Sequence, residues 1–215
     1  MDSQRTILAN RATERSAPQR CLAYAACSEL IASPHDVDPR PALLVRADHQ
    51  FDLQHVQMIE PRWAAVGSSD IAALRREYSA LFEVGSDGPP APIREQLARG
   101  DHGGVREEVV RYYDHFGYAL DEKFAWQPDH LSVELEFMHF LCYHESRSKS
   151  DPQARSVQLA QVDFTQRHLG SWLPELAIRT AALAPESIYA DVTASIAQFV
   201  LADLAWQQST ITTAG

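Results

Sequence analysis

Residues 127–145 read QPDHLSVELEFMHFLCYHE, and this stretch decides the fold of the chain. Pro128 cannot continue a helix toward the N-terminus and Asp129 is a good N-cap, so the spacing predicts a helix from Asp129 to Glu145. The apolar side chains fall on two nearly opposite stripes, with Leu131, Leu135, Met138 and Cys142 on one and Val133, Phe137 and Phe140 on the other. A helix that is apolar on two sides is expected to be wedged between layers of a protein rather than to lie on its surface.

The carboxylates of this helix need an explanation, because a charge in a wedged helix is costly unless it is paired or hydrogen-bonded. Glu136 and His139 form an E-x-x-H element, the spacing at which di-iron helix bundles supply a Glu and a His from one face. That chemistry requires a second E-x-x-H, and the sequence has none. A di-iron site at Glu136 and His139 is therefore the minor alternative. The residues favour carboxylates that bond neighbouring loops or helix ends, and histidines that are satisfied in the core.

The stretch also resembles the signature of the TorD/DmsD/NarJ family of redox-enzyme maturation chaperones, whose pattern is close to E-P-D-H-[LI]-x-x-E-[LF]-x-F-M. The matching positions are Pro128, Asp129, His130, Leu131, Glu134, Leu135, Phe137 and Met138. Gln127 replaces the usual acidic residue. The motif version with D-H-L-S-V-E-L-E-F-M-H is most similar to chaperones that serve ethylbenzene and dimethyl sulfide dehydrogenases and selenate and chlorate reductases.

Two further elements extend the resemblance, so that together they cover about Tyr24 to Trp206. Upstream, Glu77-Tyr78 with Leu81-Phe82, then Gly88-Pro89-Pro90, resembles an E-Y-x-x-L-F element followed by a proline-rich loop. Downstream, His168-Leu169-x-x-Trp172 resembles an H-L-x-x-W element. The match weakens after Pro90, where Ala91-Pro92-Ile93 stand in place of the residues that the family often has.

The resemblance implies a TorD-like, all-helical chaperone rather than an enzyme. Such proteins bind the apo catalytic subunit of a dimethyl-sulfoxide-reductase-type molybdoenzyme at its twin-arginine signal peptide or N-terminal segment. They assist molybdenum cofactor insertion before export, in some cases with cofactor biosynthesis proteins, and occur as monomers or domain-swapped dimers. The implied client-binding residues are the carboxylates Asp129, Glu134 and Glu136 with His130, and a groove border of Tyr78, Pro89, Pro90, Trp126 and Pro128. An acidic rim beside an apolar groove would suit a peptide that carries arginines.

Composition supports a single helical, cytoplasmic protein without a bound cofactor. The chain has 215 residues, 45% of them hydrophobic, and a net charge of −10, which argues against nucleic acid and anionic membrane surfaces. Three cysteines without a C-x-x-C pair fit a reducing compartment. The apolar runs look too short for a membrane span, and the N-terminus lacks a secretory signal pattern. Motifs for nucleophilic catalysis or nucleotide binding are missing from the sequence.

Periodicity along the chain predicts one all-α domain of about eight to ten helices over residues 20–208, preceded by a flexible tail over residues 1–19. Helices are expected from Arg20 to Ser33, weakly from Leu43 to Ile59, and then over 71–82, 105–116, 129–145, 157–169, 175–183 and about 186–206. Residues 85–92 are expected to be a loop because of their glycines and prolines, and Gly117 is expected to end its helix. The connector 118–127 is expected to be loop, and the resemblance implies that it acts as a hinge for exchange between subunits.

Overall fold

The computed structural model describes residues 12–46, 49–83, 85–86, 88–100, 103–122 and 127–211, which form an all-helical fold. The elements are α2 (Thr13–Ile31), α3 (Arg40–Arg46), α4 (Gln54–Gln57), α5 (Glu60–Gly67), α6 (Ile71–Tyr78), the π-helical turn η1 (Ser79–Glu83), α7 (Glu95–Ala98), α8 (Val105–Phe116), α9 (Leu131–Ser146), α10 (Asp151–Arg167), α11 (Leu169–Leu183) and α12 (Ile188–Thr210). Within these ranges the β pairing consists of two isolated bridges, Ser86–Gly88 and Arg94–His130. The all-α prediction is confirmed.

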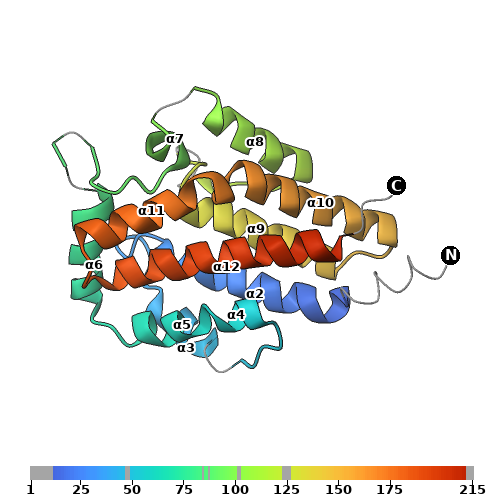
Figure 1. Ribbon diagram of the computed structural model, residues 1–215, viewed down its shortest axis with the longest axis horizontal. Coiled ribbons are helices and arrows are strands. Elements are labelled where there is room, and N and C mark those ends of the chain that lie inside the picture. Colours follow the sequence, from blue (N-terminus) through green and yellow to red (C-terminus); the bar gives the residue numbers. More distant parts are fainter. Residues whose placement is uncertain are drawn as a thin grey trace.

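Helix α9 is the centre of the molecule, as its two apolar stripes predict. It packs along α2 on one side and α10 on another, while α11 and α12 pack side by side across the front in Figure 1. Leu131, Leu135, Met138 and Cys142 of one stripe and Phe137 of the other are fully buried. The helix therefore lies between layers, because both stripes find apolar partners.

A buried ionic cluster joins four of these helices. Arg20 of α2 donates to Asp203 of α12 (2.6 Å), to Glu145 of α9 (3.1 Å) and to Gln161 of α10 (2.6 Å). Burial alone would raise the pKa of Asp203, but the Arg20 guanidinium beside it lowers that pKa well below its usual range. The cluster fixes how the helices stack, since each buried charge needs its partners.

The N-terminal prediction is wrong in its boundary. Helix α2 begins at Thr13 rather than near Arg20, and Ser16 and Ala17 are buried. Residues 1–11 lie outside the described residues, so only 13–19 of the expected tail are corrected. Burial of one face outweighs the presence of Pro18, whose missing N–H falls in the second turn of the helix.

Three other boundaries differ from the expectation. The weak helix over 43–59 is replaced by the separate short helices α3, α4 and α5. Helix α10 starts at Asp151, and α11 runs through Pro174, so the break between them is only at His168. The last helix continues to Thr210, beyond the predicted end near Trp206. Tertiary packing sets these limits, which local propensity determines poorly.

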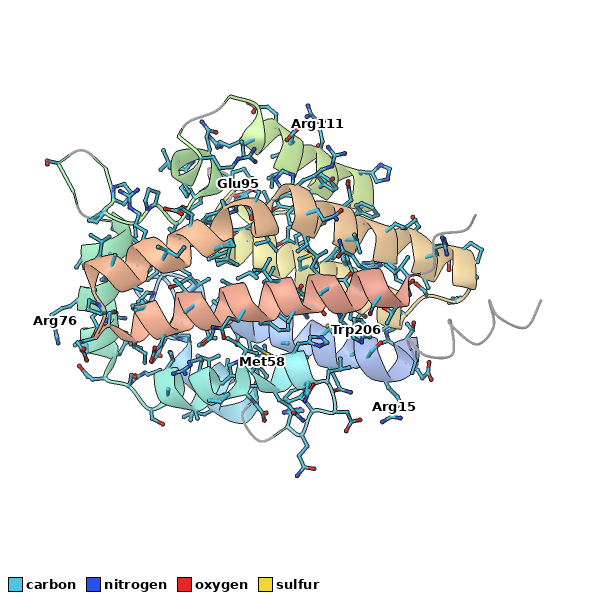
Figure 2. All side chains as sticks on the ribbon, viewed as in Figure 1. Arg15, Met58, Arg76, Glu95, Arg111 and Trp206 are labelled. Atoms are coloured by element: carbon cyan, nitrogen blue, oxygen red, sulfur yellow. The ribbon has the colours of Figure 1, made fainter. Side chains whose placement is uncertain are left out.

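Helix α12 is, by length and composition alone, long and apolar enough to cross a membrane, which corrects the expectation that no apolar run is long enough. Half of its most apolar 18-residue window is buried inside the protein. Asp203, in its C-terminal half, accepts hydrogen bonds from Arg20 and Tyr24. In Figure 2, Trp206 lies near the same end of α12, where its ring stacks on the Arg20 guanidinium at 5.3 Å. Core packing therefore accounts for the apolar composition of α12.

Candidate functional site

The entry to α9 is tied to the segment that carries α7. The backbone N–H of Glu95 donates to Asp129 O (2.9 Å), and the N–H of Leu131 donates to Ile93 O (3.1 Å). From the other side, the Tyr113 hydroxyl donates to the carbonyl of Pro128 at 2.9 Å. These bonds hold residues 128–131 beside residues 93–95 and bury Pro128.

Asp129 is fully buried and does not cap its own helix, so the predicted N-cap is wrong. Its carboxylate accepts from the backbone N–H of Gln96 (3.2 Å), in the first turn of α7, and faces Arg94 (3.3 Å) and Arg106 (3.7 Å). The cap of α9 is His130, whose side chain accepts from the N–H of Ser132. Pairing with residues 93–95 turns the Asp129 side chain toward α7. There it caps a helix that has no capping side chain of its own.

Glu134 is also fully buried, where it accepts from the indole N–H of Trp172 at 3.3 Å. Burial, and then the negative charges of Glu95 and Asp129, raise the pKa of Glu134 well above its usual value. Glu95 itself is held by His168 (2.8 Å) and Arg99 (2.7 Å), and Figure 2 labels it where α7 meets the corner between α10 and α11. Asp129 and Glu134 therefore form a buried polar floor, and the expectation that they provide an acidic surface is wrong.

The two side chains of the E-x-x-H element of α9 contact different parts of the protein. Glu136 is exposed and faces the phenol of Tyr118. Burial raises the pKa of that phenol, and the charge of Glu136 and its hydrogen bond to the phenol raise it further. The Nδ1 atom of His139 lies 2.9 Å from Cys21 O of α2. Across the part of the chain that the structure describes, His, Cys, Asp and Glu side chains form no group of three suited to a metal ion.

His130 follows Asp129 of the buried polar floor and also lines a pocket. Burial, and then the positive charge of Arg94, lower the pKa of His130 from 6.5 to about 4, so its ring is neutral at physiological pH. The N–H of Ser132 donates to Nδ1 (3.2 Å), which leaves the ring proton on Nε2. That atom lies 3.2 Å from the Tyr78 hydroxyl, so it donates to Tyr78 and leaves the phenol proton for another acceptor.

The pocket, named here the α7 pocket, has a volume of about 430 Å³. Its lining comes from the loop after α2, from α6 and η1, from the α7 segment and from the start of α9: Ser33, His35, Asp36, Tyr78, Phe82, Glu83, Pro89, Ile93, Arg94, Leu97, Gln127 and His130. The structure thus brings together three of the predicted residues, Tyr78, Pro89 and His130. Pro90 is held apart by Arg179, which donates to its carbonyl oxygen, and Trp126 lies outside the described residues.

Sequence reasoning missed the acidic rim of this pocket, Asp36 and Glu83, both exposed. Glu83 ends η1, directly after the predicted Leu81-Phe82 element, and accepts from the Ser79 hydroxyl at 2.7 Å. Short π-helical turns are frequent at functional sites because they shift a helix face locally. Here η1 supplies both the apolar Phe82 and the acidic Glu83 to one wall. The position of Glu83 beside a recognised element was the available signal, whereas the position of Asp36 in a loop gave none.

An all-helical fold that presents an apolar and acidic pocket above a buried polar floor defines a helical binding protein. Comparison with known proteins gives the particular family: the profile of the nitrate reductase delta subunit family matches residues 49–177, well over half of the chain. The chain therefore belongs to this family of TorD-type redox-enzyme maturation chaperones. Its named relatives are chaperones, not enzymes.

Individual relatives agree with this assignment. The chain is 36% identical over 130 residues to the selenate reductase assembly chaperone protein of Thauera selenatis, covering 59% of this chain and 66% of that protein. Identity to the chlorate reductase assembly chaperone protein of Ideonella dechloratans is 35% with the same coverage, so the match spans just under two thirds of either relative. A crystal structure described as a redox enzyme maturation protein from Archaeoglobus fulgidus has the same fold, with a TM-score of 0.53 and 22% identity over 84% of this chain and 93% of that one.

Proposed function

We propose that this protein is a cytoplasmic chaperone for the apo catalytic subunit of a molybdenum-containing reductase or dehydrogenase. In this proposal it binds the basic N-terminal segment of the client, of the twin-arginine type, and keeps the apoprotein competent for cofactor insertion before export. The support from relatives is their names, which describe assembly of selenate, chlorate and perchlorate reductases. The partnership with cofactor biosynthesis proteins and the choice between monomer and domain-swapped dimer stay predictions.

The observation that carries the proposal is the chemistry of the α7 pocket. Asp36 and Glu83 on its rim are exposed and can accept hydrogen bonds from an arginine guanidinium. Phe82, Ile93 and Leu97 line the same pocket, and Leu97 is 42% exposed. A twin-arginine segment offers a cation beside an apolar stretch, which is the pairing that this lining can receive.

The buried residues of the signature then position the pocket rather than touch the client. Asp129 holds the first turn of α7, which carries Leu97, and His130 orients the Tyr78 hydroxyl. The free phenol proton of Tyr78 can be donated to a backbone carbonyl of an extended peptide. Glu134, whose pKa is raised by burial, belongs to the same buried floor and accepts from Trp172.

Calorimetric titration of a twin-arginine signal peptide tests the proposal. Glu83→Gln and Asp36→Asn should each weaken binding by about three- to tenfold, since each removes a charge-assisted hydrogen bond. Replacing the peptide arginines by lysines should weaken binding to the wild type, because lysine lacks the bidentate fork. Affinity should also fall with added salt, since charges at the rim are screened.

Glu14→Gln is the matched control, because Glu14 is exposed in the first turn of α2, at the end of that helix opposite the α7 pocket. It removes one negative charge without touching the pocket. If Glu14→Gln weakened binding as much as Glu83→Gln does, only the net charge of the protein would attract the peptide. The α7 pocket would then be excluded as the binding site.

A further inference from the structure

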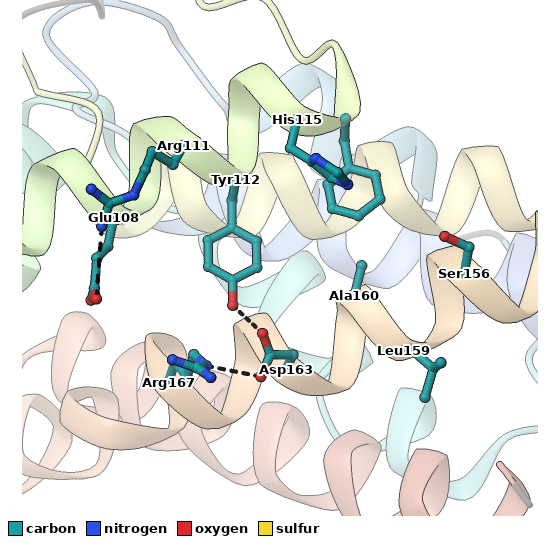
Figure 3. A pocket seen from close by; sticks show the side chains of 10 residues that line it. Glu108, Arg111, Tyr112, His115, Ser156, Leu159, Ala160, Asp163 and Arg167 are labelled. Atoms are coloured by element: carbon teal, nitrogen blue, oxygen red, sulfur yellow. Dashed lines mark hydrogen bonds and ion pairs between the residues drawn. The ribbon is translucent and has the colours of Figure 1, made fainter. Parts of the chain in front are cut away.

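A second concave surface, named here the α8–α10 groove, lies between α8 and α10 and plays no part in the proposed function. Its main part, about 590 Å³, is lined from α8 by Glu108, Arg111, Tyr112, His115 and Phe116, and from α10 by Ser156, Leu159, Ala160, Asp163 and Arg167. Figure 3 shows the α8 side chains reaching across toward α10. In Figure 1 these helices lie at the upper right, away from α6 and η1 at the left.

The groove continues past Phe116 and Ser156 into a second hollow of about 320 Å³, which His144, Arg147 and Val157 also line. Along α10 the two hollows run from Gln153 to Arg167, about 21 Å at 1.5 Å per residue. That length matches about four turns of a helix. The groove is therefore long enough for a helical segment and longer than a compact small molecule requires.

The floor of the groove is apolar and is anchored in the core. The Tyr112 ring packs edge-on against Phe164 at 5.2 Å, and Phe116 lies 6.2 Å from Phe137. Leu159 of α10 also lines the groove and is 47% exposed. A rigid aromatic base with an exposed leucine is the kind of surface that accepts the apolar stripe of an amphipathic helix.

The rim of the groove carries more arginines than acids although the chain has a net charge of −10. Three arginines, Arg111, Arg147 and Arg167, and two histidines, His115 and His144, face it, against the two acids Glu108 and Asp163. Asp163 is occupied by Arg167 (2.8 Å) and by the Tyr112 hydroxyl, as the dashed lines in Figure 3 show. The pair between Arg111 and Glu108 is long, 3.9 Å, and Arg111 is 70% exposed.

We infer that the α8–α10 groove is a docking site for an acidic amphipathic helix of a partner protein. The apolar stripe of that helix lies over Leu159 and Phe116, and its carboxylates reach Arg111 at one end and Arg147 at the other. This site is separate from the α7 pocket, whose acidic rim selects the opposite charge. The inference goes beyond the proposed function and does not depend on it.

Two synthetic peptides of about 16 residues test the inference by fluorescence anisotropy. Both carry a leucine stripe at helical spacing; one has glutamates on its flanks and the other has lysines at the same positions. The full-length protein should bind the glutamate peptide about tenfold more tightly than the lysine peptide. Leu159→Glu should weaken binding of the glutamate peptide by at least about tenfold, and Arg111→Glu should reduce the preference between the two peptides.

Ile178→Glu is the matched control, since Ile178 is 65% exposed on α11 and does not line the groove. It should leave both affinities unchanged. Equal affinity for the two peptides, no binding of the glutamate peptide, or the same loss with Ile178→Glu as with Leu159→Glu would each overturn the inference. Leu159→Glu should also leave binding of the twin-arginine peptide within about twofold of wild type. The groove inference and the proposed function can therefore be tested independently.

Discussion

The α7 pocket exposes acidic side chains, whereas the α8–α10 groove exposes arginines, although both surfaces belong to one acidic chain. The pocket places exposed acids, Asp36 and Glu83, above a floor whose own carboxylates are buried, and the groove surrounds an apolar floor with arginines. The acids of the signature stretch do not supply the pocket rim: Asp129 is paired with arginines, and Glu134 is fully buried with its pKa raised by that burial. The comparison teaches that the net charge of −10 does not indicate where a charged ligand binds. What matters is which charges remain exposed.

The largest expected effect comes from removing the carboxylate that supports the α7 pocket. Asp129→Ala would leave the first turn of α7 uncapped and would remove the buried carboxylate that Arg94 and Arg106 face, so we expect the free energy of unfolding to fall by about 3 kcal/mol. Denaturant unfolding measures this loss. Twin-arginine peptide binding should fall with it, while the glutamate peptide still binds the groove.

Asp129→Asn is the control, because its amide oxygen can still cap α7 although the charge is lost. We expect an intermediate loss of stability. If Asp129→Ala were as stable as wild type, Asp129 would not support the pocket, and the division between floor and rim would have to be abandoned.

Lowering the pH should destabilise the folded structure at the α7 pocket, which His130 lines, more than at the groove. The pKa of His130 is lowered from 6.5 to about 4, so the folded state binds fewer protons than the unfolded state between these values. The stability from neutral His130 is therefore present above pH 6.5 and is lost as the pH falls toward 4, by about 3 kcal/mol in total. Protonation of Nδ1 also removes the acceptor that caps α9.

His130→Asn isolates this contribution from that of Glu134, whose pKa is raised by burial. Asparagine keeps an N-cap acceptor and does not titrate. The difference in unfolding free energy between wild type and His130→Asn, measured from pH 7 to pH 4.5, should shrink as the pH falls. A difference that does not change with pH would mean that folding does not shift the pKa of His130.

A smaller effect is expected at the hydroxyl that faces the pocket. Tyr78→Phe removes the phenol that accepts from His130 and can donate to the peptide backbone, so binding of the twin-arginine peptide should weaken by about 1 kcal/mol, roughly fivefold. Calorimetric titration measures this change. Tyr143→Phe, at an exposed position of α9 outside the pocket, should change nothing. Unaltered affinity of Tyr78→Phe would place the peptide backbone away from Tyr78.

The smallest expected effect is at Glu134. Because its pKa is raised on folding, the stability associated with the protonated form is fully present below the ordinary value of 4.5 and is lost as the pH rises through the raised value. Glu134→Gln mimics the neutral acid, so it should melt close to wild type near pH 5 and at an equal or higher temperature near pH 8. Strong destabilisation at both pH values would show that an ionised carboxylate is needed there.

The sequence by itself determined the helical class, the central place of α9 and the family. The two apolar stripes of α9 and the ordered signature elements are local patterns, and local patterns can be recognised in the sequence without coordinates. Tyr78, Pro89 and His130 were found as pocket residues for the same reason, because they belong to those elements.

Only the tertiary structure decided which carboxylates are exposed and what each one contacts. Asp129 has the sequence signature of an N-cap, yet it caps α7, since pairing between residues 93–95 and 129–131 turns its side chain that way. The pKa of Glu134 is raised first by burial and then by the charge of Glu95, which is distant along the chain but lies near it in the core. The groove likewise exists only where α8 and α10 face each other across a gap. Desolvation and long-range charge depend on neighbours in space, and those neighbours are set by the packing of the whole chain.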